Sequence, residues 1–289
     1  MAVNVYRGRG QFTGRGALDD SRLRVLTPEP GDAHFAHVSQ IIQEQSSISE
    51  EATSLSPSAS PPLAMTKKML LVSTSAPSMG GNPTGLWLGE LAEPWYVFTE
   101  AGYELTLASP GGGAIPIDAG SMGGDFFTAD SKKFMHDAAA VGALCHSAKL
   151  SEVDLGSFDA MFICGGHGCC VDGAQMKSAI ETLYNAGKLV CADCHGPYGL
   201  IDCVKADGTP LVAGHEVTAF TNLEEEQAGA KDWVAGNAKF METEFKAQGA
   251  TFKNADPWNS FVVVSGNLVT CQNPQSAQDG AKKCVEILS

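Results

Sequence analysis

The sequence predicts an α/β fold in which a mostly parallel sheet is covered by helices on both faces. From Lys67 onward, short apolar segments typical of strands alternate with longer segments of helical periodicity. Most of these apolar segments are continuous, as expected for parallel strands buried on both faces. Chemistry in such sheets gathers beyond the carboxyl ends of the strands, so the residues that follow each strand are the first candidates for a site.

The predicted elements follow one another in a regular order. Apolar segments predict strands at 67–75, 103–112, 158–168, 188–194 and 216–222, followed by a hairpin over 261–273 that turns at Gly266 and Asn267. Helical periodicity predicts helices at 86–102, around 131–141, and at 174–188, 237–250 and 276–289, with a further helix directly after the strand at 188–194. Gly102 and Gly187 are typical of helix ends.

The composition is that of one sizeable globular domain with an additional polar segment. The chain has 289 residues, of which 44% are hydrophobic, and its apolar runs are far shorter than the ~20 residues of a membrane-spanning helix. The sequence therefore predicts no membrane partner. The stretch Ser46–Pro62 is polar and cannot bury enough apolar surface to fold. We therefore predict a disordered N-terminal extension at 1–66 and one folded domain at 67–289.

Cysteine usage and the N-terminus bear on the cellular compartment. Nine cysteines, an odd number, lie in apolar segments, which favours free thiols in a reducing compartment such as the cytoplasm. The first 18 residues contain three arginines and no acidic residue, as in organellar transit peptides, so an organelle is the alternative location.

The charge distribution limits the kinds of partner. The formal net charge is −14 at pH 7, which argues against DNA or RNA as a ligand. All arginines lie between Arg7 and Arg24, so the predicted domain has no guanidinium group with which to hold a carboxylate or phosphate. These observations favour a small substrate that is neutral or weakly polar.

The segment KLVCADCHGPYGL, residues 188–200, places a cysteine where a strand breaks into a Gly-Pro turn. Such a strand-to-helix elbow holds its apical residue, Cys194, in a sparsely allowed backbone conformation with an exposed side chain. Amides of the following helix, with Pro197 at its first position, are expected to lower the pKa of the thiol. The sequence thus predicts an activated nucleophile beside His195, with a buried structural cysteine as the alternative.

Several motifs identify the chain as similar to a known superfamily. The segment ADCHGPYGL resembles the nucleophile elbow of the ThiJ/PfpI superfamily, which has a flavodoxin-like sandwich fold and class I glutamine amidotransferase relatives. TGLWLGELAEPWYVFTEAGYELTLASPGGGAIPID, FICGGHGCCVD, GHEVTAFTNLEEE and DPWNSFVVVSGNLVTCQNPQSA resemble its branch of glutathione-independent glyoxalase III and stress chaperones. The resemblance covers residues 67–289 in the expected order.

The resemblance implies a set of catalytic residues. The family nucleophile corresponds to Cys194 and its adjacent histidine to His195, while the acidic partner of that histidine corresponds to Glu225, with Glu224 and Glu226 as neighbouring registers. The family's glutamate beside the cysteine corresponds to Glu90, whose pKa burial would raise. From the residues alone, the acidic triplet at 224–226 is equally an ordinary helix start, and Glu90 is equally a surface residue.

The turn GGHG at 165–168 is a candidate oxyanion site. The backbone amides of Gly166 and His167, with that of His195, would stabilise an oxyanion, and the His167 side chain could touch substrate. The alternative is that His167 is an ordinary loop residue.

Other residues near the elbow are notable. Asp193 stands where the family commonly has an apolar residue, and its charge would oppose thiolate formation. Cys191 should lie inside the strand, too far from Cys194 for a disulfide. Cys169 and Cys170 are candidates for touching the site or resolving an oxidised Cys194.

The resemblance implies conversion of methylglyoxal, or a similar 2-oxoaldehyde, to D-lactate through a hemithioacetal on Cys194. No cofactor is implied, and no His/Cys spacing requires a metal. Alternatives are a cysteine amidase or peptidase, a protein deglycase, and a stress chaperone or a redox sensor in which Cys194 is oxidised. Because family members are commonly dimers, a homodimer is the oligomeric state that the resemblance suggests.

Overall fold

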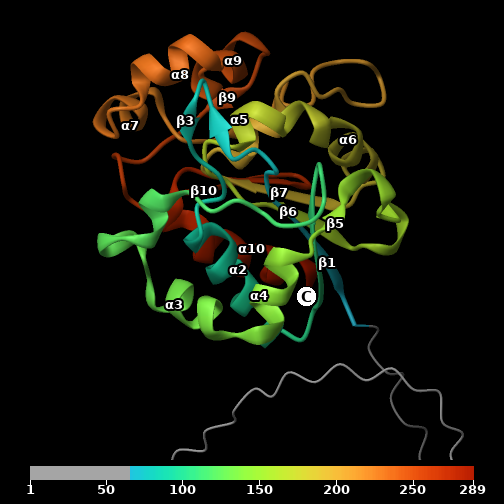
Figure 1. Cartoon of the computed structure of the whole chain (residues 1–289). Helices are drawn as coiled ribbons and strands as arrows, with labels where there is room; N and C mark the ends of the chain where they lie inside the picture. Colours follow the sequence, from blue (N-terminus) through green and yellow to red (C-terminus); the bar gives the residue numbers. More distant parts are fainter. Residues whose placement is uncertain (1–65) are drawn as a thin grey trace, which may run out of the picture. The chain divides into compact units, whose positions relative to one another are not determined.

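The computed structural model describes residues 66–289, whose helices and strands are shown in Figure 1. The predicted extension at 1–66 lies outside the described residues except for Thr66. A seven-stranded sheet in the order β10-β11-β7-β6-β1-β4-β5 forms the centre. Every neighbouring pair is parallel except β10 with β11, which confirms the predicted mostly parallel sheet.

The strands of this sheet are short and mostly coincide with the predicted apolar segments. They are β1 (Lys68–Val72), β4 (Glu104–Ser109), β5 (Ala148–Lys149), β6 (Ala160–Ile163), β7 (Leu189–Asp193), β10 (Val262–Ser265) and β11 (Leu268–Cys271). The edge strand β5 was not predicted, because its two residues form no apolar segment. The hairpin β10–β11 turns at Gly266, whose φ of +65° suits glycine, as expected.

Successive residues of each strand face opposite layers of the molecule. In β1, Leu70 and Val72 belong to one hydrophobic core, whereas Met69 and Leu71 belong to the other. The first core is covered by α6 (Lys177–Asn185) and α9 (Met241–Ala247); the second is covered by α2 (Gly89–Glu100), α3 (Ala129–His136), α4 (Ala138–Cys145) and α10 (Ala277–Leu288). Figure 1 shows α2, α3, α4 and α10 together on one side of the sheet and α6 on the other.

One predicted helix is divided into two. The segment around 131–141 forms the end of α3 and the beginning of α4, with a break at Asp137. Asp137 has an extended backbone, and its carboxylate accepts hydrogen bonds from the N–H groups of Ala139 and Ala140. The break exists because this residue caps the second helix rather than continuing the first.

The prediction of a strand over 216–222 was largely wrong. Only β8 (Glu216–Val217) is a strand, and it pairs with β9 (Thr251–Phe252) in a separate two-stranded sheet. The residues that follow cross the ends of β7 and β11, where Phe220 N–H donates to the carbonyl of Cys194 at 3.0 Å. Their backbone groups are therefore used in tertiary contacts instead of a longer strand.

The remaining elements lie around the carboxyl ends of the strands. They are β2 (Ser78–Met79), β3 (Asn82–Pro83), α5 (Cys169–Asp172), α7 (Asn222–Gln227) and α8 (Lys231–Asn237). The helix predicted at 237–250 is confirmed only as α9, because Phe240 before it has an extended backbone. Among residues 66–289, no helix has the length and apolar character needed to cross a membrane.

Candidate active site

Cys194 occupies a strained elbow at the end of β7, as predicted. Its φ is +55°, a left-handed conformation that non-glycine residues rarely adopt. The elbow is held from both sides, because its N–H donates to the carbonyl of Cys271 and its carbonyl accepts from Phe220 N–H, each at 3.0 Å. Two segments distant in sequence thus keep the cysteine in a conformation that it would not adopt alone.

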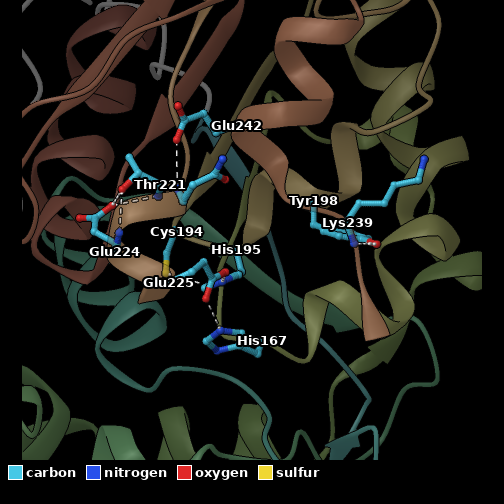
Figure 2. A network of polar contacts seen from close by, with 10 residues as sticks. His167, Cys194, His195, Tyr198, Thr221, Glu224, Glu225, Lys239 and Glu242 are labelled. Carbon is cyan, nitrogen blue, oxygen red and sulfur yellow. Dashed lines mark hydrogen bonds and ion pairs between the residues drawn. The ribbon is translucent and has the colours of Figure 1, made fainter. Parts of the chain in front are cut away.

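The Cys194 thiol begins a chain of polar contacts, which Figure 2 shows from close by. Its Sγ lies 3.2 Å from Nδ1 of His195, and Nε2 of His195 lies 2.8 Å from Oε1 of Glu225. The second oxygen of Glu225, Oε2, lies 3.1 Å from Nε2 of His167. The structure therefore brings the predicted Cys194, His195 and Glu225 together. It also joins His167 to them through Glu225, a contact that the sequence had not indicated.

The structure decides which of three adjacent glutamates faces His195. Glu224 instead forms a capping box with Thr221, and Glu226 is exposed and pairs with Lys231. The N-cap at Thr221 sets the start of α7. Glu225, which follows Glu224 in the first turn of this helix, is thereby directed toward the histidines. The register chosen from the resemblance is the one that the geometry supports.

Glu225 is the negatively charged member of this cluster. Burial acts to raise the pKa of its carboxyl, but His195 and His167 outweigh burial and lower this pKa to about 2. Burial is also the main influence on His195, where it lowers the pKa, with the neighbouring His167 acting in the same direction. Part of the lowering of the Glu225 pKa requires a positive charge on His195. The lowered pKa of His195, however, favours an uncharged imidazole.

We favour a neutral His195, because the side chain is buried and an N–H donated by a neutral ring also stabilises the carboxylate. The hydrogen bonds assign the tautomer of His195 in which Nε2 carries the hydrogen and donates it to Glu225. In this tautomer Nδ1 is free to accept the thiol proton of Cys194. The arrangement can thus withdraw a proton from the sulfur.

Glu90 approaches the same thiol from α2. Its side chain is completely buried, and Oε2 accepts a hydrogen bond from Gly165 N–H at 2.9 Å. The other oxygen has no partner of regular geometry within 66–289, and the Cys194 sulfur is the group placed to accept a hydrogen bond from this carboxyl when it is protonated. Burial raises the pKa of Glu90 well above its ordinary value. The predicted protonated acid beside the cysteine is therefore consistent with its surroundings.

The expectation of a lowered pKa at Cys194 was wrong. Burial raises the pKa of this thiol well above its ordinary value, and the carboxyls of Glu90 and Asp193 act in the same direction when they are ionised. The predicted helix after the elbow is only a short 3-10 helix, Gly196–Leu200, so few aligned amides face the sulfur. Burial thus disfavours the thiolate, and His195 is the group placed to take the thiol proton when the sulfur ionises.

Cys194 is also less exposed than predicted. Only 3% of the residue is accessible, yet it lies at the base of a cleft of about 520 Å³. His195, His167 and Gly166 line the same cleft. Among the described residues that line it, none is lysine or arginine. A small uncharged molecule could therefore reach the sulfur.

The turn at 165–168 passes close to the chain that leads into α2. Gly166 has a φ of +103°, and a Cβ there would collide with the carbonyl oxygen of Gly85. Only glycine therefore fits this position. Within residues 66–289, the N–H groups of Gly166, His167 and His195 donate no hydrogen bond to another residue, so the predicted oxyanion site has its amides free and stays a prediction.

Asp193 points away from the cleft into the opposite layer, where it is completely buried. Neither carboxyl oxygen has a hydrogen-bond partner within 66–289, and burial, with Glu90 second, raises its pKa well above the ordinary value. A neutral Asp193 would not oppose thiolate formation as strongly as its ionised form.

The other predicted cysteines lie apart from the chemistry. Cys191 is inside β7 and belongs to the opposite core from Cys194, as expected for a residue that cannot form a disulfide with it. Cys169 donates to the carbonyl of Cys164 at 3.3 Å, and burial raises the pKa of both Cys169 and Cys170. Neither is among the residues lining the cleft, so a redox role for them stays a prediction.

The cluster of His167, His195 and Glu225 also meets the distance requirement for a metal site. One donor atom from each lies within 4.8 Å of the others. However, both Nε2 atoms and both carboxylate oxygens are already matched in hydrogen bonds to one another. These hydrogen bonds already provide a partner for each of the four atoms, so none of them needs a metal ion as a partner.

Comparison with known proteins identifies the family. The DJ-1/PfpI family model matches residues 86–287. The chain belongs to the DJ-1/PfpI family. It is 32% identical over 214 residues to Glyoxalase 3 of Candida albicans, covering 71% of this chain and 90% of that protein. It is 30% identical over 235 residues to the glutathione-independent glyoxalase HSP31 of Saccharomyces cerevisiae, covering 77% and 98% of the two chains.

A solved structure agrees with this assignment. The crystal structure of glyoxalase III from Candida albicans superimposes with a TM-score of 0.71 at 31% sequence identity. The match covers 76% of this chain and 96% of that one. The flavodoxin-like fold expected from the resemblance is therefore confirmed for this member of the DJ-1/PfpI family.

Replacing Glu225 by glutamine is expected to reduce the kcat of the enzyme by roughly 10²-fold. A glutamine amide carries no charge, and its single oxygen can accept from only one of the two imidazole N–H groups that Glu225 serves. A steady-state assay of the purified variant measures this effect. Glu226→Gln is the matched control, since Glu226 is exposed and contacts Lys231. Equal activities of the two variants would contradict a role for the Glu225 carboxylate.

The half-buried Glu93 makes the stability of the fold depend on pH. Burial raises the pKa of Glu93, on α2, from 4.5 to about 7, so the folded protein retains a proton that the unfolded chain releases. The free energy of unfolding should therefore fall as pH rises from about 4.5 to 7. Allowing for partial solvent exposure, Glu93→Gln should remove about 1–2 kcal/mol of this fall. Glu100→Gln, at the exposed end of the same helix, should leave it unchanged in denaturant titrations at both pH values.

Proposed function

We propose that this protein converts methylglyoxal, or a related 2-oxoaldehyde, to a 2-hydroxy acid without glutathione. The observation that carries the proposal is one thiol, Cys194, placed between a hydrogen-bond acceptor on His195 and the protonated carboxyl of Glu90. The similarity to Glyoxalase 3 and to the glutathione-independent glyoxalase HSP31 supports the same reaction. The catalytic domain would be residues 67–289.

The reaction begins with addition of the thiol to the aldehyde. His195 takes the thiol proton while the sulfur bonds to the aldehyde carbon, and the resulting oxyanion is bound by the amides of Gly166 and His195. Return of the proton to this oxygen gives a neutral hemithioacetal. The addition therefore needs no ionised thiol in the resting site, in agreement with the raised pKa of Cys194.

Glu90 is then the group that transfers protons between the two carbons. Its proton passes to the ketone oxygen, and the carboxylate so formed removes the hydrogen of the hemithioacetal carbon, which gives an enediol. Protonation of the second carbon and loss of the hydroxyl proton from the first produce a thioester. Water hydrolyses the thioester, which releases D-lactate from methylglyoxal and restores the thiol. The sum is methylglyoxal plus water to lactate, with no external oxidant.

Glu90 is the residue that favours this reaction over hydrolysis of an amide. Cys194, His195 and Glu225 alone would suit an amidase or peptidase, as in other thiol hydrolases. Peptide hydrolysis has no evident use for a second, protonated carboxyl at the sulfur. A buried acid in contact with the thiol is what a proton shift between adjacent carbons requires.

The direct test is incubation of the purified protein with methylglyoxal in the absence of glutathione, followed by an assay with D-lactate dehydrogenase. We expect stoichiometric D-lactate, unchanged when a chelator is added. Consumption of methylglyoxal without lactate, or a requirement for glutathione, would refute the proposal. We further propose that the reaction takes place in the cytoplasm, since the cysteine-rich apolar segments suit a reducing compartment.

A further inference from the structure

Four aromatic side chains form a continuous aromatic wall on the cleft: Trp87, Phe126, Trp258 and Phe220. Trp87 packs edge-on against Phe126 with ring centroids 4.9 Å apart, and Phe126 lies 6.3 Å from Trp258. Trp258 in turn contacts Phe220 at 5.6 Å. Phe220 reaches the catalytic end of the cleft, where its ring is 4.7 Å from that of His195.

This wall is not needed to bind methylglyoxal. A three-carbon aldehyde would occupy a small part of the cleft of about 520 Å³, a volume typical of sites for much larger ligands. Aromatic faces bind flat apolar groups through stacked or edge-on contacts. The wall therefore provides space and surface for a substituent that methylglyoxal lacks.

Trp258 is held in place at an energetic cost. Its φ is +65°, a conformation that is strained for a bulky residue. Its backbone N–H donates to Oε1 of the buried Glu224 at 3.0 Å, and its indole Nε1–H donates to Oε1 of Gln227 at 2.7 Å. Figure 2 shows that Glu224 is itself held by Thr221. Both ends of the tryptophan are thus fixed, so the indole is presented to the cleft in one orientation.

The charge of the cleft narrows the choice of substituent. Of the described residues lining the cleft, none is cationic, and the acidic Asp118 disfavours a negatively charged group. A large substrate for this cleft should therefore be uncharged and apolar at the end distant from Cys194.

From these observations we propose that the preferred substrates are 2-oxoaldehydes that carry an aromatic ring, which binds against the aromatic wall, with Trp258 as a specificity-determining residue. This inference rests on the proposed function, because it assumes that the dicarbonyl end reacts at Cys194. Phenylglyoxal is the simplest such compound, and its product would be mandelate.

The test compares kcat and KM for phenylglyoxal and methylglyoxal with the same enzyme. We expect kcat/KM for phenylglyoxal to be about tenfold higher or more, mainly through a lower KM, as two aromatic contacts of ordinary strength would give. Trp258→Leu should lower the phenylglyoxal-to-methylglyoxal ratio about tenfold, whereas Trp258→Phe should largely retain it. Trp95→Leu is the matched control, because Trp95 packs against Phe134 on α3 and does not line the cleft.

The outcomes separate the two proposals. Turnover of methylglyoxal with no preference for phenylglyoxal would overturn the inference and leave the proposed function intact. Turnover of neither compound would overturn both.

An inhibition experiment tests the aromatic wall without the reaction. Acetophenone, which has the ring without the aldehyde, should inhibit methylglyoxal turnover competitively and far more tightly than acetone. Equal inhibition by the two ketones would count against the aromatic wall. Should Trp258→Leu fail to fold, Phe126→Leu supplies the same comparison from the neighbouring ring.

Discussion

Replacement of Cys194 by alanine is expected to abolish D-lactate formation from methylglyoxal, with a loss of at least about 10³-fold in kcat. The reason is that every step of the proposed reaction takes place on a carbon bonded to this sulfur. Cys194→Ser should be almost as inactive, because a hydroxyl is a far weaker nucleophile at neutral pH. Turnover is measured with excess substrate, so that a weak residual activity is detected.

The control for this variant is another cysteine of the same domain. Cys145 is exposed on α4, and Cys145→Ala should retain full activity. Thermal unfolding of Cys194→Ala should remain cooperative, since the elbow is held by backbone hydrogen bonds to Cys271 and Phe220 that alanine preserves. Substantial lactate formation by a folded Cys194→Ala protein would falsify the assignment of the nucleophile.

Replacement of Glu90 by glutamine is expected to reduce kcat by about 10²–10⁴-fold, the range typical of a general acid or base. Glutamine has nearly the same shape and can still accept the hydrogen bond from Gly165, so the local structure should persist. What it loses is the proton that Glu90 transfers. The matched control is Glu100→Gln near the end of the same helix, where the side chain is exposed.

A second measurement distinguishes the chemical role of Glu90 from a structural one. The protonated carboxyl of Glu90 can donate a hydrogen bond to the sulfur, which stabilises the thiolate, so Glu90→Gln, with its weaker amide donor, should raise the pKa of Cys194. Thiolate absorbance at 240 nm, followed against pH with Cys194→Ala as the blank, reports it directly. If the titration of Cys194 is unchanged, or if Glu90→Gln forms lactate at the wild-type rate, Glu90 does not act on the sulfur as proposed.

The nucleophile elbow was predictable because its signals are local, whereas Glu90 and Glu225 were expected only from the family resemblance. A Gly-Pro turn directly after an apolar strand predicts an elbow, and the positive φ of Cys194 follows from that geometry. The capping box at Thr221 is also a local signal, although Thr221 was placed in a predicted strand and not at the start of α7. By contrast, the strand predicted at 216–222 was largely wrong, since a strand-like pattern carries no information on which tertiary partners its backbone will find.

The pKa of Cys194 could not be predicted from its neighbours in the chain. The elbow suggested activation by helix amides, yet the strongest influences are burial and the carboxyl of Glu90. Glu90 lies more than a hundred positions earlier in the sequence. The contact of His167 with Glu225 was missed for the same reason, because it joins the loop after β6 to α7.

The amino-acid sequence was enough to predict most strands of the central sheet, the elbow at Cys194 and the absence of arginine from the domain, because each of these is a property of composition or of a few adjacent residues. The tertiary structure was needed to establish which glutamate faces His195, that burial raises the pKa of the Cys194 thiol, and that the four rings of the aromatic wall meet in one cleft. Electrostatic and packing interactions depend on distance in space, and folding alone brings these distant residues together.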